Sequence, residues 1–424
     1  MSVPHASEIP LARRVMAYLA ILGGYFFYCY NVLILEYVRP YLVQGYHMTL
    51  RDTALFYTSQ STAMTAGSIG AAWIVTRFGR KRTVAGITLL NGLLTIANLY
   101  FVGPAPWIVM RGLIGLVLGG YYVAAVSTMV SLFPPKYRAR LAALNSAMFS
   151  AGEVLLGIVG AWVGEGSWST LVWLGGIPPL FIAIAMWRLV PADNSYVAFG
   201  DETAAGLPAP RRASWFDMFR GPNTRLTLTC TFLAGLNFSG YQFFSGFLTT
   251  YLKMDRHLDA ATMGFIYSLS GVGSLSGGFV WGYLADRAGR RLNGVGFLAA
   301  AVVVAVYLSA PPNLALLSIL TLAYGFCLSC TYCWAVYFTE LFPAPLRPMG
   351  AALFHAGHIV SAFAPSAVAL TATPSSVAPG MWLAVPAFAA GALLWLTLPE
   401  TMRGGILYRG YVPAPLRPAG DSGE

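Results

Sequence analysis

The chain has 424 residues, of which 57% are hydrophobic and 10% are charged, and its formal net charge is +10. A soluble domain usually carries about 25% charged residues, whereas the mean hydropathy here is +0.63. These values exclude a soluble protein, because too little polar surface is available to cover the chain. Apolar runs near the roughly 20 residues needed to cross a bilayer recur throughout, without the alternation of a β-barrel strand. The composition therefore predicts an all-α membrane protein.

The basic residues are concentrated in alternate connections between the apolar runs. Twelve predicted helices with the N-terminus inside place most of the 26 basic residues on one side. Because basic loops are retained in the cytoplasm, both termini are expected to be cytoplasmic. The positive charge is thus interpreted as a topology signal in a lipid bilayer, and no nucleic-acid partner is expected. The preference for Arg over Lys favours a bacterial inner membrane.

The first half of the chain contains a short arm and six apolar segments. The arm covers residues 1–13, and the segments form a predicted bundle over 14–190. The pair Pro178-Pro179 predicts a break in the last segment, because proline lacks the backbone donor and its ring clashes with the preceding turn. The expected helices are 14–38, 53–76, 83–102, 107–133, 140–163 and 168–190.

The second half follows the same plan after a polar segment. Residues 191–222 are predicted to be a cytoplasmic linker, with a surface helix around 215–219. A second six-helix bundle is expected over 223–399, and a polar cytoplasmic tail over 400–424. The expected helices are 224–250, 260–284, 292–310, 313–340, 347–371 and 378–398.

One basic turn occurs in both halves, and each copy joins two apolar runs through a glycine flanked by basic residues. The copies are Arg77, Gly79 and Arg80 in the first half, and Asp286, Arg287, Gly289 and Arg290 in the second. Repetition at half the chain length predicts two related halves. The acidic partners differ, because Thr76 stands where Asp286 stands and Ser131 where Glu340 stands. The second half is therefore expected to hold the stronger gating contacts.

These elements together resemble the major facilitator superfamily of secondary transporters. The resemblance rests on the two basic turns, on the glycines Gly115 and Gly119 after Arg111, and on the closing Leu398-Pro399-Glu400-Thr401. It implies twelve transmembrane helices in two six-helix halves related by a parallel repeat, and transport by alternating access. Within the superfamily, the chain looks most like the proton symporters of sugars, aromatic acids and other organic acids.

Two departures from the relatives' patterns bear on mechanism. The aromatic-acid symporters carry Asp-Gly-aromatic-Asp in helix 1, where this chain has Tyr28-Cys29-Tyr30-Asn31. The missing carboxylates leave uncoupled, facilitated diffusion open. The segment 140–163 also lacks the Gly-x3-Gly-Pro pattern of drug/proton antiporters, which argues against an exporter.

Three charged residues within apolar runs are candidates for function, because burying a charge in a membrane is costly. Glu153 is expected near the bilayer middle, where a carboxyl group can carry a proton; packing against a neighbouring Ser or Asn is the alternative. Glu36 and Arg111 are expected at similar depth, so they form a plausible ion pair. Two alternatives stay open: Glu36 pairs with Arg39 on its own helix, or Arg111 is free to bind a substrate carboxylate.

Neutral polar and aromatic residues supply the remaining candidates for substrate binding. The family's first and seventh helices face its cavity, which implies that Asn31, Asn237 and Gln242 bind substrate; interhelical packing is the alternative. Further candidates are aromatic rings that can stack on a substrate, namely Tyr121, Tyr241 and Trp334. His355 is a candidate proton relay together with His358, or else both are packing histidines.

No enzyme, metal site or cofactor is expected. Cys327, Cys330 and Cys333 share one helix face, but Cys is also a common small hydrophobe in packed helices. The sequence predicts a monomeric secondary transporter that takes up a small organic acid together with protons. The alternatives are a drug or metabolite exporter, an uncoupled facilitator, and a membrane sensor without transport.

Overall fold

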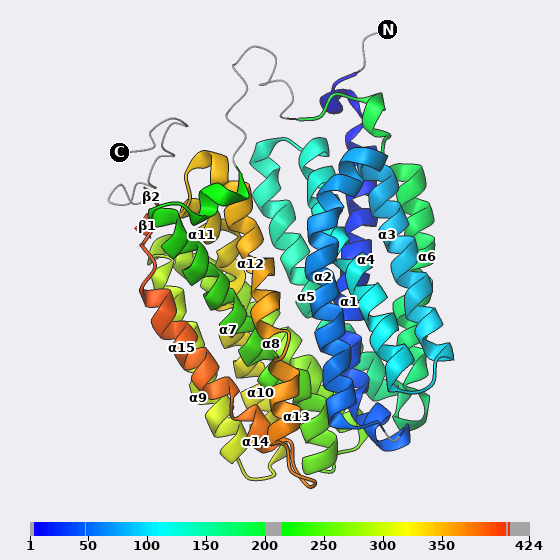
Figure 1. Ribbon diagram of the computed structural model, residues 1–424, viewed down its shortest axis with the longest axis vertical. Helices are drawn as coiled ribbons and strands as arrows, with labels where there is room; N and C mark the ends of the chain where they lie inside the picture. Colours follow the sequence, from blue (N-terminus) through cyan, green and yellow to red (C-terminus); the bar gives the residue numbers. More distant parts are fainter. Residues whose placement is uncertain (1–3, 47, 200–213, 404–405, 408–424) are drawn as a thin grey trace.

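The computed structural model describes residues 4–46, 48–199, 214–403 and 406–407. It is a bundle of long helices that run roughly side by side (Figure 1). Helix α1 (Leu11–Gly45) begins and α15 (Ala384–Leu396) ends at the same end of the bundle, at the top of Figure 1. We call this the terminal end, and the opposite end the distal end.

The first half contains six long helices, and the bounds of α1 are given above. The others are α2 (Leu50–Phe78), α3 (Arg80–Ala97), α4 (Pro104–Leu132), α5 (Pro135–Val163) and α6 (Ser169–Leu189). Short 3₁₀ turns accompany them at η1 (Ala6–Glu8), η2 (Asn98–Tyr100), η3 (Glu165–Ser167) and η4 (Asp193–Ser195).

The second half begins after a 3₁₀ turn, η6 (Trp215–Phe219), at the place of the expected surface helix. Its first helices are α7 (Pro222–Thr250), continued by a π-turn η7 (Tyr251–Asp255), then α8 (Ala260–Arg287), η8 (Arg291–Asn293) and α9 (Gly294–Ser309). They are followed by α10 (Leu314–Leu328), η9 (Ser329–Cys333), α11 (Trp334–Glu340), η10 (Ala344–Leu346), α12 (Arg347–Ser361), α13 (Ala364–Thr371), α14 (Ala378–Met381) and α15. A short antiparallel pair, β1 (Met402–Arg403) and β2 (Ile406–Leu407), follows α15; residues 408–424 of the expected tail lie outside the described residues.

Three expected helices of the second half are interrupted in the structure. Between α10 and α11, the hydroxyls of Ser329 and Thr331 donate to the carbonyls of Phe326 and Leu328, which competes with the helical hydrogen bonds. Between α12 and α13, Pro365 lies in the first turn of the new helix, where its missing donor costs nothing. The third interruption separates α14 from α15 at residues 382–383.

The predicted break at Pro178-Pro179 is wrong, because α6 continues through both prolines. Proline removes a donor to the carbonyl four residues earlier. The carbonyl that Pro179 leaves free is that of Gly175, and it accepts a hydrogen bond from Asn31 Nδ2 of α1 at 3.0 Å. A neighbouring helix thus replaces the missing bond.

Nine segments of the described structure are long and apolar enough to cross a membrane. Helices α2, α7 and α8 have 29, 29 and 28 residues but are richer in polar and small residues, so they fall outside that group. Large apolar side chains also point outward, as expected of a lipid-facing surface; they include Ile69, Trp73, Trp162, Phe181 and Phe279. The integral, multi-pass membrane character is clear, and the total of twelve spanning helices stays a prediction.

Glycines allow the closest helix pairs within each half. A Cβ atom at Gly115 or Gly119 of α4 would overlap the backbone carbonyls of Gln60 or Met64 on α2. In the second half, Gly325 of α10 lies in the same way against Ser270 of α8. Small residues thus bring the backbones into contact, as expected for helices that associate in lipid.

Candidate functional site

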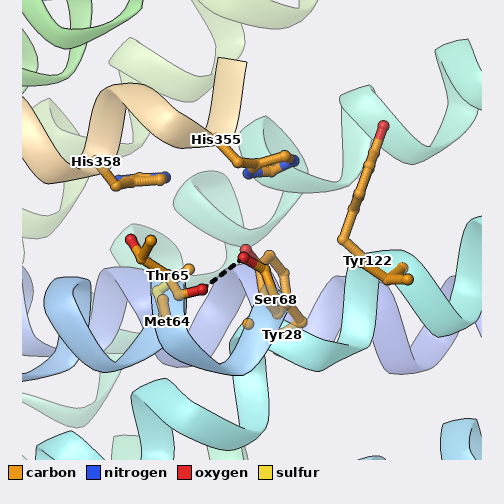
Figure 2. Close-up of a pocket in the computed structure, with 9 residues that line it drawn as sticks. Tyr28, Met64, Thr65, Ser68, Tyr122, His355 and His358 are labelled. Carbon is orange, nitrogen blue, oxygen red and sulfur yellow. Dashed lines mark hydrogen bonds between the residues drawn. The ribbon is translucent and has the colours of Figure 1, made fainter. Parts of the chain in front are cut away.

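A small cavity lies midway along the bundle, between the two halves. Helices α1, α2 and α4 form one side of it, and α12 forms the other (Figure 2). Its lining residues are Tyr28, Met64, Thr65, Ser68, Gly119, Tyr122, Val123, His355 and His358. The volume of ≈ 30 Å³ is enough for a water molecule. An organic solute needs more room, so the halves must separate before one can enter.

Aromatic rings surround this cavity on both sides. In the first half, Tyr25 and Tyr28 stack with ring centroids 5.1 Å apart. Across the boundary, the His355 ring lies 4.6 Å from that of Tyr122. Within the second half, the ring of His358 stacks on that of Phe238 of α7, with the ring centroids 3.9 Å apart. Flat, polarisable walls of this kind suit a planar ligand.

Several predicted substrate-binding residues lie away from the cavity. Asn31 is buried between helices, where its Nδ2 donates to Gly175 and, at 3.1 Å, to Asn91 Oδ1; this matches the packing alternative. Tyr121 donates to the carbonyl of Ile21. Trp334 is fully buried within the second half, and its ring centroid lies 4.9 Å from that of Trp395. Asn237 is buried on α7 and its Oδ1 has no hydrogen-bond partner among the described residues.

Glu36 joins the two halves near the distal end. Its carboxylate accepts hydrogen bonds from Tyr241 OH at 3.0 Å and from Gln242 Nε2 at 2.6 Å, both on α7. Its backbone carbonyl accepts a third, from Thr249. Arg39 lies one turn further along α1 and donates to the carbonyl of Gly246. Its positive charge attracts the carboxylate of Glu36. The predicted binding residues Tyr241 and Gln242 are thus occupied in a bridge between the halves.

The predicted pair of Glu36 with Arg111 is wrong. Arg111 Nη1 donates to Gln60 Oε1 at 3.4 Å, and its guanidinium lies 5.8 Å from the ring centroid of Trp107. These partners hold the cation against α2 and its own helix, away from α1. Arg111 is also absent from the residues that line the described cavity. Sequence spacing gave the depth of the two groups but not the direction in which each points around its helix.

Glu153 is the second buried carboxyl group at the boundary. It belongs to α5, is 2% exposed, and forms a hydrogen bond with Ser270 of α8 in the other half. Its Oε1 atom has no hydrogen-bond partner in the part of the chain that the structure describes. An ionised carboxylate is poorly satisfied in such surroundings, so the site suits a carboxyl group that holds a proton.

At the terminal end of the second half, Arg290 contacts a cluster of acidic side chains. Its guanidinium contacts Asp286 Oδ1 at 2.8 Å and both oxygens of Glu340 at 3.0 and 3.2 Å. Burial alone would lower the pKa of Arg290, but the hydrogen bond and charge of Glu340 outweigh it and raise the pKa, so the group stays charged. Arg287 is exposed and lies over the ring of Tyr283 instead.

Glu400 completes this cluster, although the sequence reasoning gave it no role. It accepts hydrogen bonds from the backbone N–H groups of Arg290 and Arg291, at 2.7 and 3.0 Å. A Cβ atom at Gly289 would lie against the same carboxylate, and the φ of Gly289 is +113°, which favours glycine. The glycine of the turn thus makes room for an acid that follows the last helix.

The first half contains a corresponding contact that the sequence reasoning missed. Asp193, which follows α6, accepts a hydrogen bond from Arg80 Nε at 2.6 Å and approaches the backbone N–H of Lys81. A Cβ atom at Gly79, with φ +84°, would again meet this carboxylate. Thr76 instead donates to its own helix, and Arg77 is exposed. An acid from the predicted linker therefore contacts the basic turn of the first half, in place of the one that this turn lacks.

The described hydrogen bonds between the halves lie at the centre and toward the distal end. Besides the Glu36 bridge, Thr58 of α2 donates to the carbonyl of Ala362, and Ser61 to that of His358. Near the centre, the hydroxyls of Ser150 on α5 and Tyr332 in η9 are 2.5 Å apart. The clusters of Arg80 and Arg290 each stay within one half. In this conformation the halves are joined at the distal end.

A family model described as "Major Facilitator Superfamily" matches residues 21–339 and 255–420. The chain belongs to this superfamily. Its members are membrane transporters, so the protein is a transporter and not an enzyme. This agrees with the resemblance on which the sequence interpretation rested.

Curated relatives within the superfamily carry transporter names. The gallate transporter of Pseudomonas putida is 22% identical, over 61% of this chain and 62% of its own length. The niacin transporter NiaP of Acinetobacter baylyi is 23% identical, over 82% and 85%. The probable 4-methylmuconolactone transporter of Cupriavidus pinatubonensis is 26% identical, over 90% of each chain.

Solved structures of the superfamily share the fold. A D-xylose–proton symporter superposes with a TM-score of 0.73 at 18% identity, covering 91% of this chain and 98% of its own. The xylose transporter XylE of E. coli, in a partially occluded inward-open conformation, gives 0.70 at 16% identity, with 92% and 99% covered. At this identity the likeness concerns the fold.

Proposed function

We propose that the protein takes up a small organic acid together with protons, by alternating access. The names of the relatives support the substrate class, since gallate and niacin are aromatic acids. The aromatic walls of the cavity fit a planar solute of that kind. We further propose that the protein works as a monomer in a bacterial inner membrane, with both termini in the cytoplasm.

The position of Glu153 carries the proton-coupling part of the proposal. This carboxyl group is buried at the boundary between α5 and α8, and one of its oxygens lacks a partner among the residues described. A carboxyl group so poorly satisfied in a membrane interior is stable when protonated. When the halves separate, water reaches it and it can release the proton on the side that has opened.

Glu36 is the group that would couple the proton to movement. Its carboxylate uses both oxygens to accept hydrogen bonds from α7, and this holds the distal ends of the halves together. Protonation removes the negative charge, and hydrogen bonds to a neutral carboxyl group are roughly half as strong as those to a carboxylate. Protonation therefore weakens the bridge and favours opening at the distal end.

The two clusters at the terminal end act within the halves and not between them. Arg290 with Glu340, and Arg80 with Asp193, tie each turn to the rest of its own half. Each half is thus stiffened at that end and can rotate as a body about the central cavity. Alternating access requires one end of the bundle to open while the other closes, and halves that rotate as rigid bodies allow this.

Uptake into proteoliposomes tests the proposal. The solutes are radiolabelled benzoate, nicotinate and gallate, and the interior is held at the same pH as the exterior, made more alkaline or made more acidic. Weak acids follow a pH gradient without a carrier, so protein-free liposomes measured in parallel are the control. We expect carrier-dependent uptake that rises with the gradient, and a loss of this dependence in Glu153→Gln.

The alternatives give other results. Carrier-dependent uptake that ignores the gradient would identify an uncoupled facilitator. Uptake driven by an acidic interior would identify an exporter. No carrier-dependent movement of any of the three acids would refute the proposed substrate class.

A further inference from the structure

The central cavity raises the question of which group binds the carboxylate of an organic acid. A carboxylate in a membrane interior needs a cation or strong donors close to it. Arg111 is the obvious candidate by charge, but it lies two turns along α4 from the cavity residue Gly119, bound to Gln60. The lining residues of this cavity include no Arg, Lys, Asp or Glu.

We propose that His355 and His358 together form the site that binds the substrate's carboxylate. This inference rests on the proposed function and specifies which residues recognise the acid. Both histidines are on α12 and both line the cavity. Figure 2 shows their rings together on one side of it, with Thr65, Met64, Ser68 and Tyr28 on the other.

The geometry of the two imidazoles suits a single carboxylate. Their ring centroids are 6.2 Å apart and their planes differ by 23°. A ring nitrogen donates or accepts in the plane of its ring, so two nearly parallel rings can each present one nitrogen to one oxygen of a carboxylate that lies at their edges. His358 Nδ1 is buried and has no partner among the described residues, so a donor or acceptor position there is vacant.

The surrounding rings fix the imidazoles in place. His358 lies flat against Phe238 at 3.9 Å, with an interplanar angle of 19°. His355 is held between Tyr122 at 4.6 Å and Phe354 at 5.3 Å. A binding group that is already oriented loses little conformational entropy when the ligand arrives. Rings from α4, α7 and α12 itself thus support a preformed site.

The charge balance of the cavity makes the pair a proton-linked site. The titratable groups that line it with the histidines are Tyr28 of α1 and Tyr122 of α4, while α2 supplies Met64, Thr65 and Ser68. From the helices packed behind α12, α7 presents Phe238 and α11 presents Trp334 to Phe354, and neither titrates. An organic anion would enter with its charge uncompensated, so one imidazole must bind a proton with it.

The test compares acids with amides of the same shape. Purified protein is titrated with benzoate and benzamide, and with nicotinate and nicotinamide. The variants are His355→Phe, His358→Phe and the double variant, because Phe keeps the ring stacking and removes the nitrogens. We expect the wild-type protein to bind at least one acid about tenfold or more tightly than its amide, since hydrogen bonds to a charged group are worth roughly that.

The Phe variants should lose this preference while amide affinity changes little. A purely structural role would weaken acid and amide equally, so the ratio separates the two explanations. Wild-type acid affinity should also fall as the pH is raised, and the double variant should lose that dependence. Replacement by Leu, which also removes the nitrogens, serves as the second set of variants if a Phe variant fails to fold.

Several outcomes would overturn the inference. They are an unchanged acid preference in the double variant, loss of the preference in Arg111→Gln with its retention in the histidine variants, or no acid preference in the wild-type protein. If liposomes carrying the double variant still prefer the acid in driven uptake, this inference fails and the proposed function stands. If the wild-type protein moves none of the acids, the proposed function fails as well.

Discussion

The two terminal clusters should contribute unequally to stability, and Glu340→Gln tests this against Asp193→Asn. Glu340 is 13% exposed and accepts two hydrogen bonds from Arg290, at 3.0 and 3.2 Å, and one from Thr401. Arg290 itself is 6% exposed. A neutral amide removes the charge and turns one acceptor into a donor, but Asp286 still contacts Arg290. We expect the free energy of unfolding to fall by about 2 kcal/mol. This value lies between the effect of losing a partly exposed hydrogen bond and that of breaking a buried ion pair.

Asp193 is the matched control for this change. Its bond with Arg80 is short, at 2.6 Å, but the two side chains are 24% and 29% exposed, and the second contact is a long one with the backbone of Lys81. Solvent screens a pair of this kind, so Asp193→Asn should lower the free energy of unfolding by about 1 kcal/mol or less.

Thermal unfolding of both purified variants in one detergent, followed by tryptophan fluorescence, measures the difference. We expect a lower midpoint for Glu340→Gln than for Asp193→Asn. Equal midpoints, or the reverse order, would contradict the reasoning from burial. A double variant that loses the sum of the two effects would show that the clusters are independent, as expected of contacts confined to separate halves.

The remaining predictions concern the boundary between the halves and the helix contacts. Glu36→Gln should abolish gradient-driven uptake but leave exchange of labelled for unlabelled acid, because the amide cannot release a proton; loss of exchange as well would argue against coupling. Thr76→Asp would place an acid where the first turn has none, but Arg80 already contacts Asp193, so probe-cysteine accessibility at the terminal end should change little, whereas a large shift would show that Asp193 is a weak partner. Gly119→Val should prevent stable assembly, because its side chain would overlap the Met64 carbonyl; a monodisperse, active variant would be inconsistent with the close α2–α4 contact.

Much of the helical plan could be predicted from the sequence. The apolar runs placed most of the long helices to within about five residues, because the length needed to cross a bilayer is set by its thickness. The first helix is an exception, since it was expected to end at residue 38 and continues to Gly45. The repeated turn identified the loops that Gly79 and Gly289 shape. The glycines of α4 that carried the resemblance also allow the close packing on α2.

The site was harder to predict, because spacing along a helix gives depth but not the direction of a side chain. Glu36 and Arg111 are at similar depth, yet one points toward α7 and the other toward α2. Asn31 has the position expected of a cavity residue but bonds to the carbonyl that Pro179 leaves free. Its rotation, and therefore its role, depends on a proline distant in sequence.

Two further features depend on contacts between distant segments. Asp193 lies in a polar stretch that reads as linker, and its contact with Arg80 joins residues 113 positions apart. The histidines were weighed as a relay on one helix face. That they share a cavity with Tyr28 and Tyr122 follows from the packing of α12 against the first half, which no local pattern contains.

The most direct test of the account is the ratio of gradient-driven uptake to exchange in the same proteoliposomes. Both rates are measured with one labelled acid, for the wild-type protein and for Glu153→Gln, after subtraction of protein-free liposomes. We predict that the wild-type rate rises with an alkaline interior and falls to the exchange level with a protonophore, while Glu153→Gln exchanges but is not driven. Equal response of both proteins to the gradient would contradict a proton carried by this carboxyl group.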